Sequence, residues 1–171
     1  MTGIAIRRIR ADEGLRLRAL RLRALADAPL AFGSTLAREQ AFAESVWDER
    51  AAGAAAGSAR ATFVAEARGQ WVGLATGVAR HPDDLDHSPI LVGMFVDATQ
   101  RGRGVGAALV ERVTDWVRAL PAERLYLWAT STNRPAIALY EKCGFHRTAE
   151  TRPLDHTPSL VEVLMVRHLR P

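Results

Sequence analysis

A run of glycines and arginines near the middle of the chain has the composition of a phosphate-binding loop. It occupies residues 100–109, between an apolar segment and a long amphipathic one, and reads Gln-Arg-Gly-Arg-Gly-Val-Gly-Ala-Ala-Leu. If the flanking segments are a strand and a helix, the loop presents unpaired backbone N–H groups at the positive end of the helix dipole, where phosphate binds. Glycine lets a phosphate approach the backbone, and Arg101 and Arg103 add positive charge. The loop therefore predicts a site for a phosphate-bearing ligand.

Two common nucleotide-binding loops fit these residues poorly. A Walker A loop needs a lysine followed by serine or threonine, whereas the single lysine, Lys142, lies elsewhere. The dinucleotide fingerprint GxGxxA matches Gly102, Gly104 and Ala107, but the next predicted strand, 125–129, ends without the acidic residue that binds ribose. An ordinary tight turn is the remaining alternative for the glycines.

A second group of polar and aromatic residues lies at 125–145. Asn133 can cap a helix that begins at the following Arg-Pro pair. Tyr140 is either a core aromatic on that amphipathic helix or a proton donor. Cys143 suits a small buried hydrophobe better than a nucleophile, because no histidine is near it in sequence.

Together the two motifs resemble the GCN5-related N-acetyltransferases (GNAT superfamily). Arg101, Gly104 and Gly106 match that family's Arg-x-x-Gly-x-Gly loop for the acyl-CoA pyrophosphate, and residues 125–145 match its later strand, asparagine and tyrosine helix. The matching residues follow the family's order and cover about residues 90–145. The resemblance implies an α/β fold of the GNAT type, an α+β arrangement in which helices flank a central twisted mixed β-sheet. It also implies an acetyl-CoA-dependent N-acetyltransferase.

The resemblance assigns roles to individual residues. Acetyl-CoA is the implied cosubstrate, and its pantetheine arm lies between two splayed parallel strands. The residues implied to bind it are Met94, Phe95, Val96, Arg101, Gly102, Arg103, Gly104, Val105, Gly106, Ala107, Asn133 and Tyr140. An amine attacks the thioester directly in a ternary complex, and a backbone N–H of Phe95 or Val96 stabilises the oxyanion. Tyr140 then protonates the departing thiolate as the general acid.

The sequence does not identify the general base. Many members of the family carry a glutamate on the strand before the loop, but residues 88–96 contain no acidic residue. The candidates are Glu39, Glu66, His87 and His156, or a water chain with no single base. The acceptor is a primary amine of a small molecule or protein. Five acidic residues either attract it or are simply solvated: Glu39, Glu44, Asp83, Asp84 and Asp86.

Composition indicates one soluble domain over residues 1–171. The chain is 48% hydrophobic and 25% charged, with a net charge of +4. One cysteine excludes an internal disulfide, and the five histidines lack metal-ligand spacing, so no metal site is expected. Without a secretory signal or a membrane-spanning apolar segment, we expect a cytoplasmic protein. Dimers are common among similar proteins, so a homodimer is an alternative to a monomer.

Two other functions are weighed against catalysis. A non-catalytic acyl-CoA-binding sensor would use the same loop and would bind CoA without turnover. Nucleic-acid binding would use the arginine-rich helix predicted at 13–28, but the mild net charge of +4 does not imply a nucleic-acid coat.

Hydrophobic periodicity predicts the elements that position these motifs. On the helix at 13–28, capped by Asp12, one apolar strip holds Leu15, Ala19 and Leu22 and another holds Leu17, Leu20 and Ala24. The remaining predictions are a strand at 4–10, a helix from Ser34 or Thr35 through Trp47, a hairpin of 62–67 and 71–79, a strand at 90–96 buried on both faces, a helix at 104–120, a strand at 125–129, a helix at 134–143, and strands near 145–149 and 160–166. Alternating strands and helices in the second half predict crossover connections and partly parallel pairing.

Overall fold

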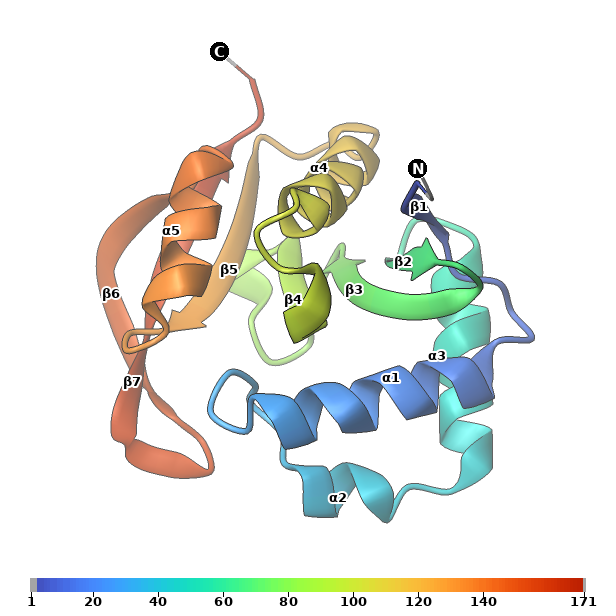
Figure 1. Cartoon of the computed structure of the whole chain (residues 1–171). Helices are drawn as coiled ribbons and strands as arrows, with labels where there is room; N and C mark the ends of the chain where they lie inside the picture. The colour runs from blue at the N-terminus through green and yellow to red at the C-terminus, as the bar shows by residue number, and fades with distance from the viewer. Residues whose placement is uncertain (1–2, 171) are drawn as a thin grey trace.

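In the computed structural model, which describes residues 3–170, a seven-stranded mixed β-sheet carries helices on both faces (Figure 1). The strand order is β1-β2-β3-β4-β5-β7-β6, and β4 and β5 form its parallel pair. The elements are β1 (Ala5–Arg8), α1 (Gly14–Asp27), α2 (Leu36–Gln40), α3 (Glu44–Ala55), β2 (Arg60–Ala67), β3 (Gln70–Val78), β4 (Ile90–Val96), α4 (Val105–Arg118), β5 (Arg124–Thr130), α5 (Arg134–Lys142), β6 (His146–Leu154) and β7 (Thr157–His168). The predicted mixed α/β architecture is confirmed.

Two hydrophobic cores lie on opposite faces of the sheet. Beneath α4 and α5, the apolar stripe of α4 packs mainly on β3 and β2, and the core that it forms also reaches β5. Leu109, Val113 and Leu127 of this core are fully or almost fully buried. On the other face, α1 and α3 cover β2 and β3 around the fully buried Trp47. Phe95 of β4 belongs to this second core.

The first helix buries one of its two predicted strips and packs only part of the other, because Leu22 contacts the second core. Leu17, Leu20 and Ala24 are buried, whereas Leu15 is 59% exposed. The reason is that α1 lies on α3, α2 and β3, which leaves Leu15 and Ala19 of the second strip facing solvent. The predicted cap is also wrong: the N-cap residue is Glu13, without a side-chain cap hydrogen bond, and its buried carboxylate binds arginines instead.

The single helix predicted through Trp47 is two helices, α2 and α3. Thr35 caps α2, because its side chain accepts a hydrogen bond from the Arg38 N–H at 3.2 Å. Of the two predicted caps, Ser34 and Thr35, Thr35 is therefore the one used. Phe42 lies between the helices and packs on Trp47, with ring centroids 6.1 Å apart. An unbroken helix would place residues five positions apart roughly 140° from each other, so this contact requires the break.

The strand β4 departs from the prediction of burial on both faces. Its register with β5 contains one pair, Ile90 with Tyr126, after which the two strands diverge. Against β3 it carries a bulge around Gly93 (φ 64°). Between two paired positions the chain advances three residues along β4 but only two along β3. Ile90, Leu91 and Phe95 are buried, but the residues between them are partly exposed, since divergence leaves this part of the strand without a neighbour on its β5 side.

Candidate active site

The glycine loop joins β4 to α4 and presents a row of backbone donors. Gly102 (φ 72°) and Gly104 (φ 81°) have left-handed conformations, which favour glycine. Within residues 3–170, the N–H groups of residues 102–107 have no hydrogen-bond acceptor; the first helical bond runs from the Ala108 N–H to the Gly104 carbonyl at 3.0 Å. These free donors lie at the N-terminus of a 14-residue helix, an arrangement suited to a phosphate group.

The two arginines of this loop differ in their surroundings. Arg101 donates from Nε to the Val96 carbonyl (2.9 Å) and from its NH2 group to Asp27 at the end of α1 (2.6 Å). Arg103 is exposed, and its guanidinium has no hydrogen-bond or ion-pair partner in the described part of the chain. Arg101 thus ties the loop to β4 and α1, and Arg103 is the arginine left free for an anion.

The edge of β4 that faces the diverging β5 carries unpaired backbone groups. The Asp97 N–H donates to the Val72 carbonyl of β3 at 2.7 Å. The backbone N–H and C=O groups of successive residues point to opposite edges of a strand. Those of Phe95 therefore also point to β3, while those of Val96 point to the opposite edge. The Val96 carbonyl bound to Arg101 agrees with this direction. Of the two residues predicted to supply an oxyanion donor, Val96 is therefore the one whose N–H faces the gap.

Tyr140 lies on α5 within the core under α4, and is 7% exposed. Its ring meets Phe145 edge-on at 5.9 Å between centroids. Its hydroxyl makes no hydrogen bond with residues 3–170, and burial, together with the nearby Cys143, raises the pKa of the phenol above its ordinary value. Tyr140 is thus both the core aromatic and a protonated hydroxyl without an internal partner.

Two neighbouring residues of α5 have structural positions. Asn133 caps the helix, since its Oδ1 accepts a hydrogen bond from the Ala136 N–H at 3.3 Å. Cys143 is buried, and burial raises the pKa of its thiol. Because a thiol is a nucleophile only as thiolate, a raised pKa argues against covalent catalysis by Cys143.

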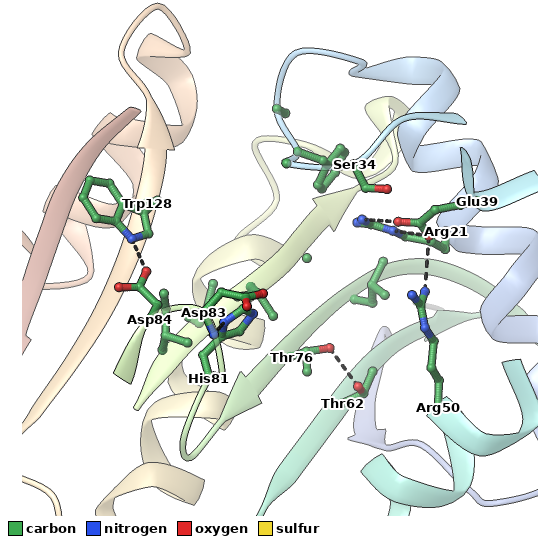
Figure 2. Close-up of a pocket in the computed structure, with 18 of the residues that line it drawn as sticks. Arg21, Ser34, Glu39, Arg50, Thr62, Thr76, His81, Asp83, Asp84 and Trp128 are labelled. Atoms are coloured by element: carbon green, nitrogen blue, oxygen red, sulfur yellow. Dashed lines mark hydrogen bonds and ion pairs between the residues drawn. The ribbon is translucent and has the colours of Figure 1, made fainter. Parts of the chain in front are cut away.

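A cavity of about 440 Å³ lies on the α1 side of β3 and β4 (Figure 2). The loop between α1 and α2 covers it and is fixed to the sheet, because the Leu30 carbonyl accepts a hydrogen bond from Thr130 and the Phe32 carbonyl contacts His156 Nε2 at 2.7 Å. In Figure 2, Arg21, Glu39 and Arg50 lie on one side, and Trp128 with Asp84 lies on the other.

The structure separates the four candidate bases. Glu39 lines the cavity and is 2% exposed. Burial opposes its ionisation, but Arg21 and Arg50 outweigh burial and lower the pKa of Glu39, which makes it a weak proton acceptor. Glu66, His87 and His156 are not among the cavity's lining residues. Glu66 of β2 pairs instead with Arg7 of the edge strand β1 and with Arg16 of α1.

Several cavity residues were not identified from the sequence. They are Arg60 of β2, Arg152 of β6, Asp155 in the turn that follows and Glu162 of β7. A usable signal existed for Glu162, which is a single acid within an apolar run from Leu160 to Val166. The other three lie at the start of β2, within β6 and in the turn after it, and their spacing carries no motif.

Comparisons with known proteins agree with this fold and loop. The Acetyltransferase (GNAT) family matches residues 24–145, which is more than half of the chain, so the chain belongs to this family. A mycothiol acetyltransferase of Corynebacterium glutamicum (strain R) is 40% identical over 62 residues, covering 34% of this chain and 21% of that protein. An N-acetylaspartate synthetase of Danio rerio is 34% identical over 89 residues, covering 52% of this chain and 30% of that protein. The chain thus spans less than a third of either relative.

Solved structures share the whole fold at low sequence identity. An acetyltransferase of the GNAT family from Streptococcus pneumoniae has a TM-score of 0.81 at 19% identity and covers 97% of this chain and 99% of its own. A Salmonella typhimurium protein solved with its cofactor acetyl-CoA has a TM-score of 0.73 at 19% identity and covers 99% of this chain and 95% of its own. Over residues 3–170, no helix is long and apolar enough to cross a membrane. The same residues contain no group of three His, Cys, Asp or Glu side chains able to hold a metal ion.

Proposed function

We propose that this protein is an acetyl-CoA-dependent N-acetyltransferase that acts on a primary amine by direct attack in a ternary complex. The observation that carries the proposal is the row of free N–H donors at residues 102–107, placed where β4 and β5 diverge. Donors at a helix N-terminus suit a pyrophosphate, and the unpaired edge of β4 suits an extended amide-bearing chain such as pantetheine.

In this proposal the loop and Arg103 bind the pyrophosphate, while Arg101 holds the loop in place. Met94, Phe95 and Val96 line the pantetheine arm, Gly106 belongs to the loop around the pyrophosphate, and Asn133 flanks the arm in addition to capping α5. A cosubstrate here supplies an activated acetyl thioester. The Val96 N–H, which faces the gap, is the proposed donor to the thioester oxygen as negative charge develops there.

Tyr140 is the proposed general acid. Its raised pKa keeps the phenol protonated at neutral pH, and its hydroxyl has no partner within residues 3–170 that would compete for the proton. A proton donated to the departing thiolate prevents charge from accumulating on sulfur. For the base we propose a water chain, because Glu39 has a lowered pKa and the other three candidates do not line the cavity.

The test is release of free thiol from acetyl-CoA in the presence of a broad panel of amines. Release that depends on an added amine supports the proposal. Binding of CoA without turnover across the panel would support the sensor function instead. Failure to bind CoA at all would contradict both.

We also propose a cytoplasmic location, because the single cysteine is buried and unpaired, as suits a reducing compartment. A homodimer is proposed on the family resemblance alone. Light scattering on the purified protein measures the mass in solution and decides between monomer and dimer.

A further inference from the structure

The charges that line the cavity are sorted between its two ends. At the end formed by α1, α2, α3 and β2, four guanidinium groups accompany one carboxylate; these are Arg21, Arg38, Arg50 and Arg60 with Glu39. At the end formed by the loop before β4 and by β6 and β7, four carboxylates accompany one guanidinium; these are Asp83, Asp84, Asp155 and Glu162 with Arg152. The cavity is therefore positive at one end and negative at the other.

The single carboxylate at the positive end is already fully used. Arg21 binds both oxygens of Glu39, at 2.9 and 3.1 Å, and Arg50 approaches one of them at 3.3 Å. No acceptor within residues 3–170 contacts the Arg60 guanidinium, which also lines the cavity. Burial and the neighbouring positive charge of Arg50 lower the pKa of Arg60.

An arginine in this position is unfavourable for the protein alone. A partly buried charge without a partner loses hydration and gains no ion pair in return. Arginine's planar fork binds a carboxylate through two parallel hydrogen bonds, so Arg60 and Arg50 together suit such a group. The missing anion would come from a ligand.

The negative end lies beside the gap between β4 and β5. Trp128 is two residues beyond the last β5 position paired with β4, and its Nε1 donates to Asp84. Arg152 stacks over the same ring at 4.2 Å and pairs with Asp84 and Glu162. Both oxygens of Asp84 are occupied, because His87 Nδ1 contacts the other one at 2.7 Å. Asp83 and Asp155 have no ion-pair partner within residues 3–170, so carboxylates remain in excess here, which favours a cationic amine close to the proposed thioester site.

We propose that the acceptor is a small aminocarboxylic acid, whose carboxylate binds Arg60 and Arg50 and whose amine lies at the negative end, near Asp83 and Asp155. This substrate class rests on the proposed acetyltransferase function. The cavity, about 440 Å³, has the size of a small-molecule site. A protein amine is the alternative acceptor and becomes an outcome of the test.

The test uses matched acceptor pairs that differ only in the carboxylate. Amino acids from glycine to 6-aminohexanoate, with the common α-amino acids, are compared with their primary carboxamides in the thiol-release assay. Simple alkylamines and a peptide with a free N-terminus complete the panel. We expect the best acid to exceed its amide in kcat/KM by about tenfold or more, as loss of a charged hydrogen bond implies.

Variants of Arg60 locate the source of this preference. Arg60→Gln should bring the ratio of acid to amide close to one, mainly through a higher KM for the acid, and Arg60→Lys should restore part of it. Arg118→Gln is the matched control, because Arg118 lies on α4 and pairs with Asp115 away from the cavity. The Tm of Arg60→Gln should equal or exceed that of the parent, since the substitution removes an unpaired charge.

Three results would overturn the inference. If amides, alkylamines or the peptide are acetylated as well as the acids, the proposed carboxylate site is wrong, but the acetyltransferase function is unaffected. A lower Tm for Arg60→Gln would show that Arg60 has a structural role rather than a ligand role. Absence of transfer to every acceptor would overturn the proposed function and this inference together.

Discussion

Replacement of Tyr140 by phenylalanine is the sharpest test of the chemistry. The substitution removes one hydroxyl from a residue that is 7% exposed and leaves the ring in contact with Phe145. That hydroxyl makes no hydrogen bond with residues 3–170, so no internal partner is left unsatisfied. The fold should therefore tolerate the change, and the effect on catalysis can be read without a folding defect.

The two expected magnitudes are far apart. Loss of a general acid lowers rates by about 10²- to 10⁴-fold, which corresponds to about 3–5 kcal/mol in the barrier. The free energy of unfolding, in contrast, should change by less than about 1 kcal/mol, because a hydroxyl without a partner contributes little. Binding of CoA should also be nearly unchanged, because Tyr140 lies on α5, whereas the loop proposed to bind the pyrophosphate precedes α4.

The assay measures kcat by thiol release with the best acceptor, and unfolding by urea. Tyr126→Phe is the matched control, because Tyr126 is the chain's other tyrosine and lies on β5 at the start of the divergence. A Tyr140→Phe variant with kcat within about threefold of the parent would refute the assignment of the acid, given the range expected for acid catalysis. A variant that lost activity only because it unfolded would show a lower urea midpoint.

Three further predictions concern charge. Glu13→Gln should lower stability at pH 7, because hydrogen bonds from Arg7 lower the pKa of buried Glu13 from 4.5 to about 2, a shift worth on the order of 3 kcal/mol. A carboxylate whose pKa is lowered in the folded state contributes stability above its unfolded-state pKa, so in urea titrations the difference from the parent should shrink as pH falls from about 4.5 towards 2. Arg103→Gln should raise the KM for acetyl-CoA by about three- to tenfold and leave the Tm unchanged, whereas an unchanged KM would remove Arg103 from the phosphate site. Burial opposes protonation of His87, but Asp84 and Glu150 outweigh it and raise its pKa above 6.5, so its stabilising effect is present below pH 6.5 and is lost as pH rises through the folded-state pKa. His87→Gln should therefore lower the Tm more at pH 6 than at pH 9, and an equal loss at both would contradict the assignment.

The elements with local sequence signals were predictable. The hairpin of β2 and β3 follows from alternation around Arg-Gly-Gln, and α5 follows from an Asn-Arg-Pro start. The hairpin of β6 and β7 extends beyond its predicted strands, to His146–Leu154 and Thr157–His168. The edge strand β6 is mostly exposed, so it has no hydrophobic pattern to mark its length.

The sequence by itself determined the glycine loop, because left-handed glycines, a preceding strand and a following helix are all local properties of residues 90–118. Only the tertiary structure decided what faces that loop. The divergence of β4 from β5 depends on how two distant strands pair, and the cavity joins Arg60 of β2 to Glu162 of β7. Charges meet across such distances in sequence only when the sheet has formed, so spacing along the chain could not reveal a cavity with one positive and one negative end.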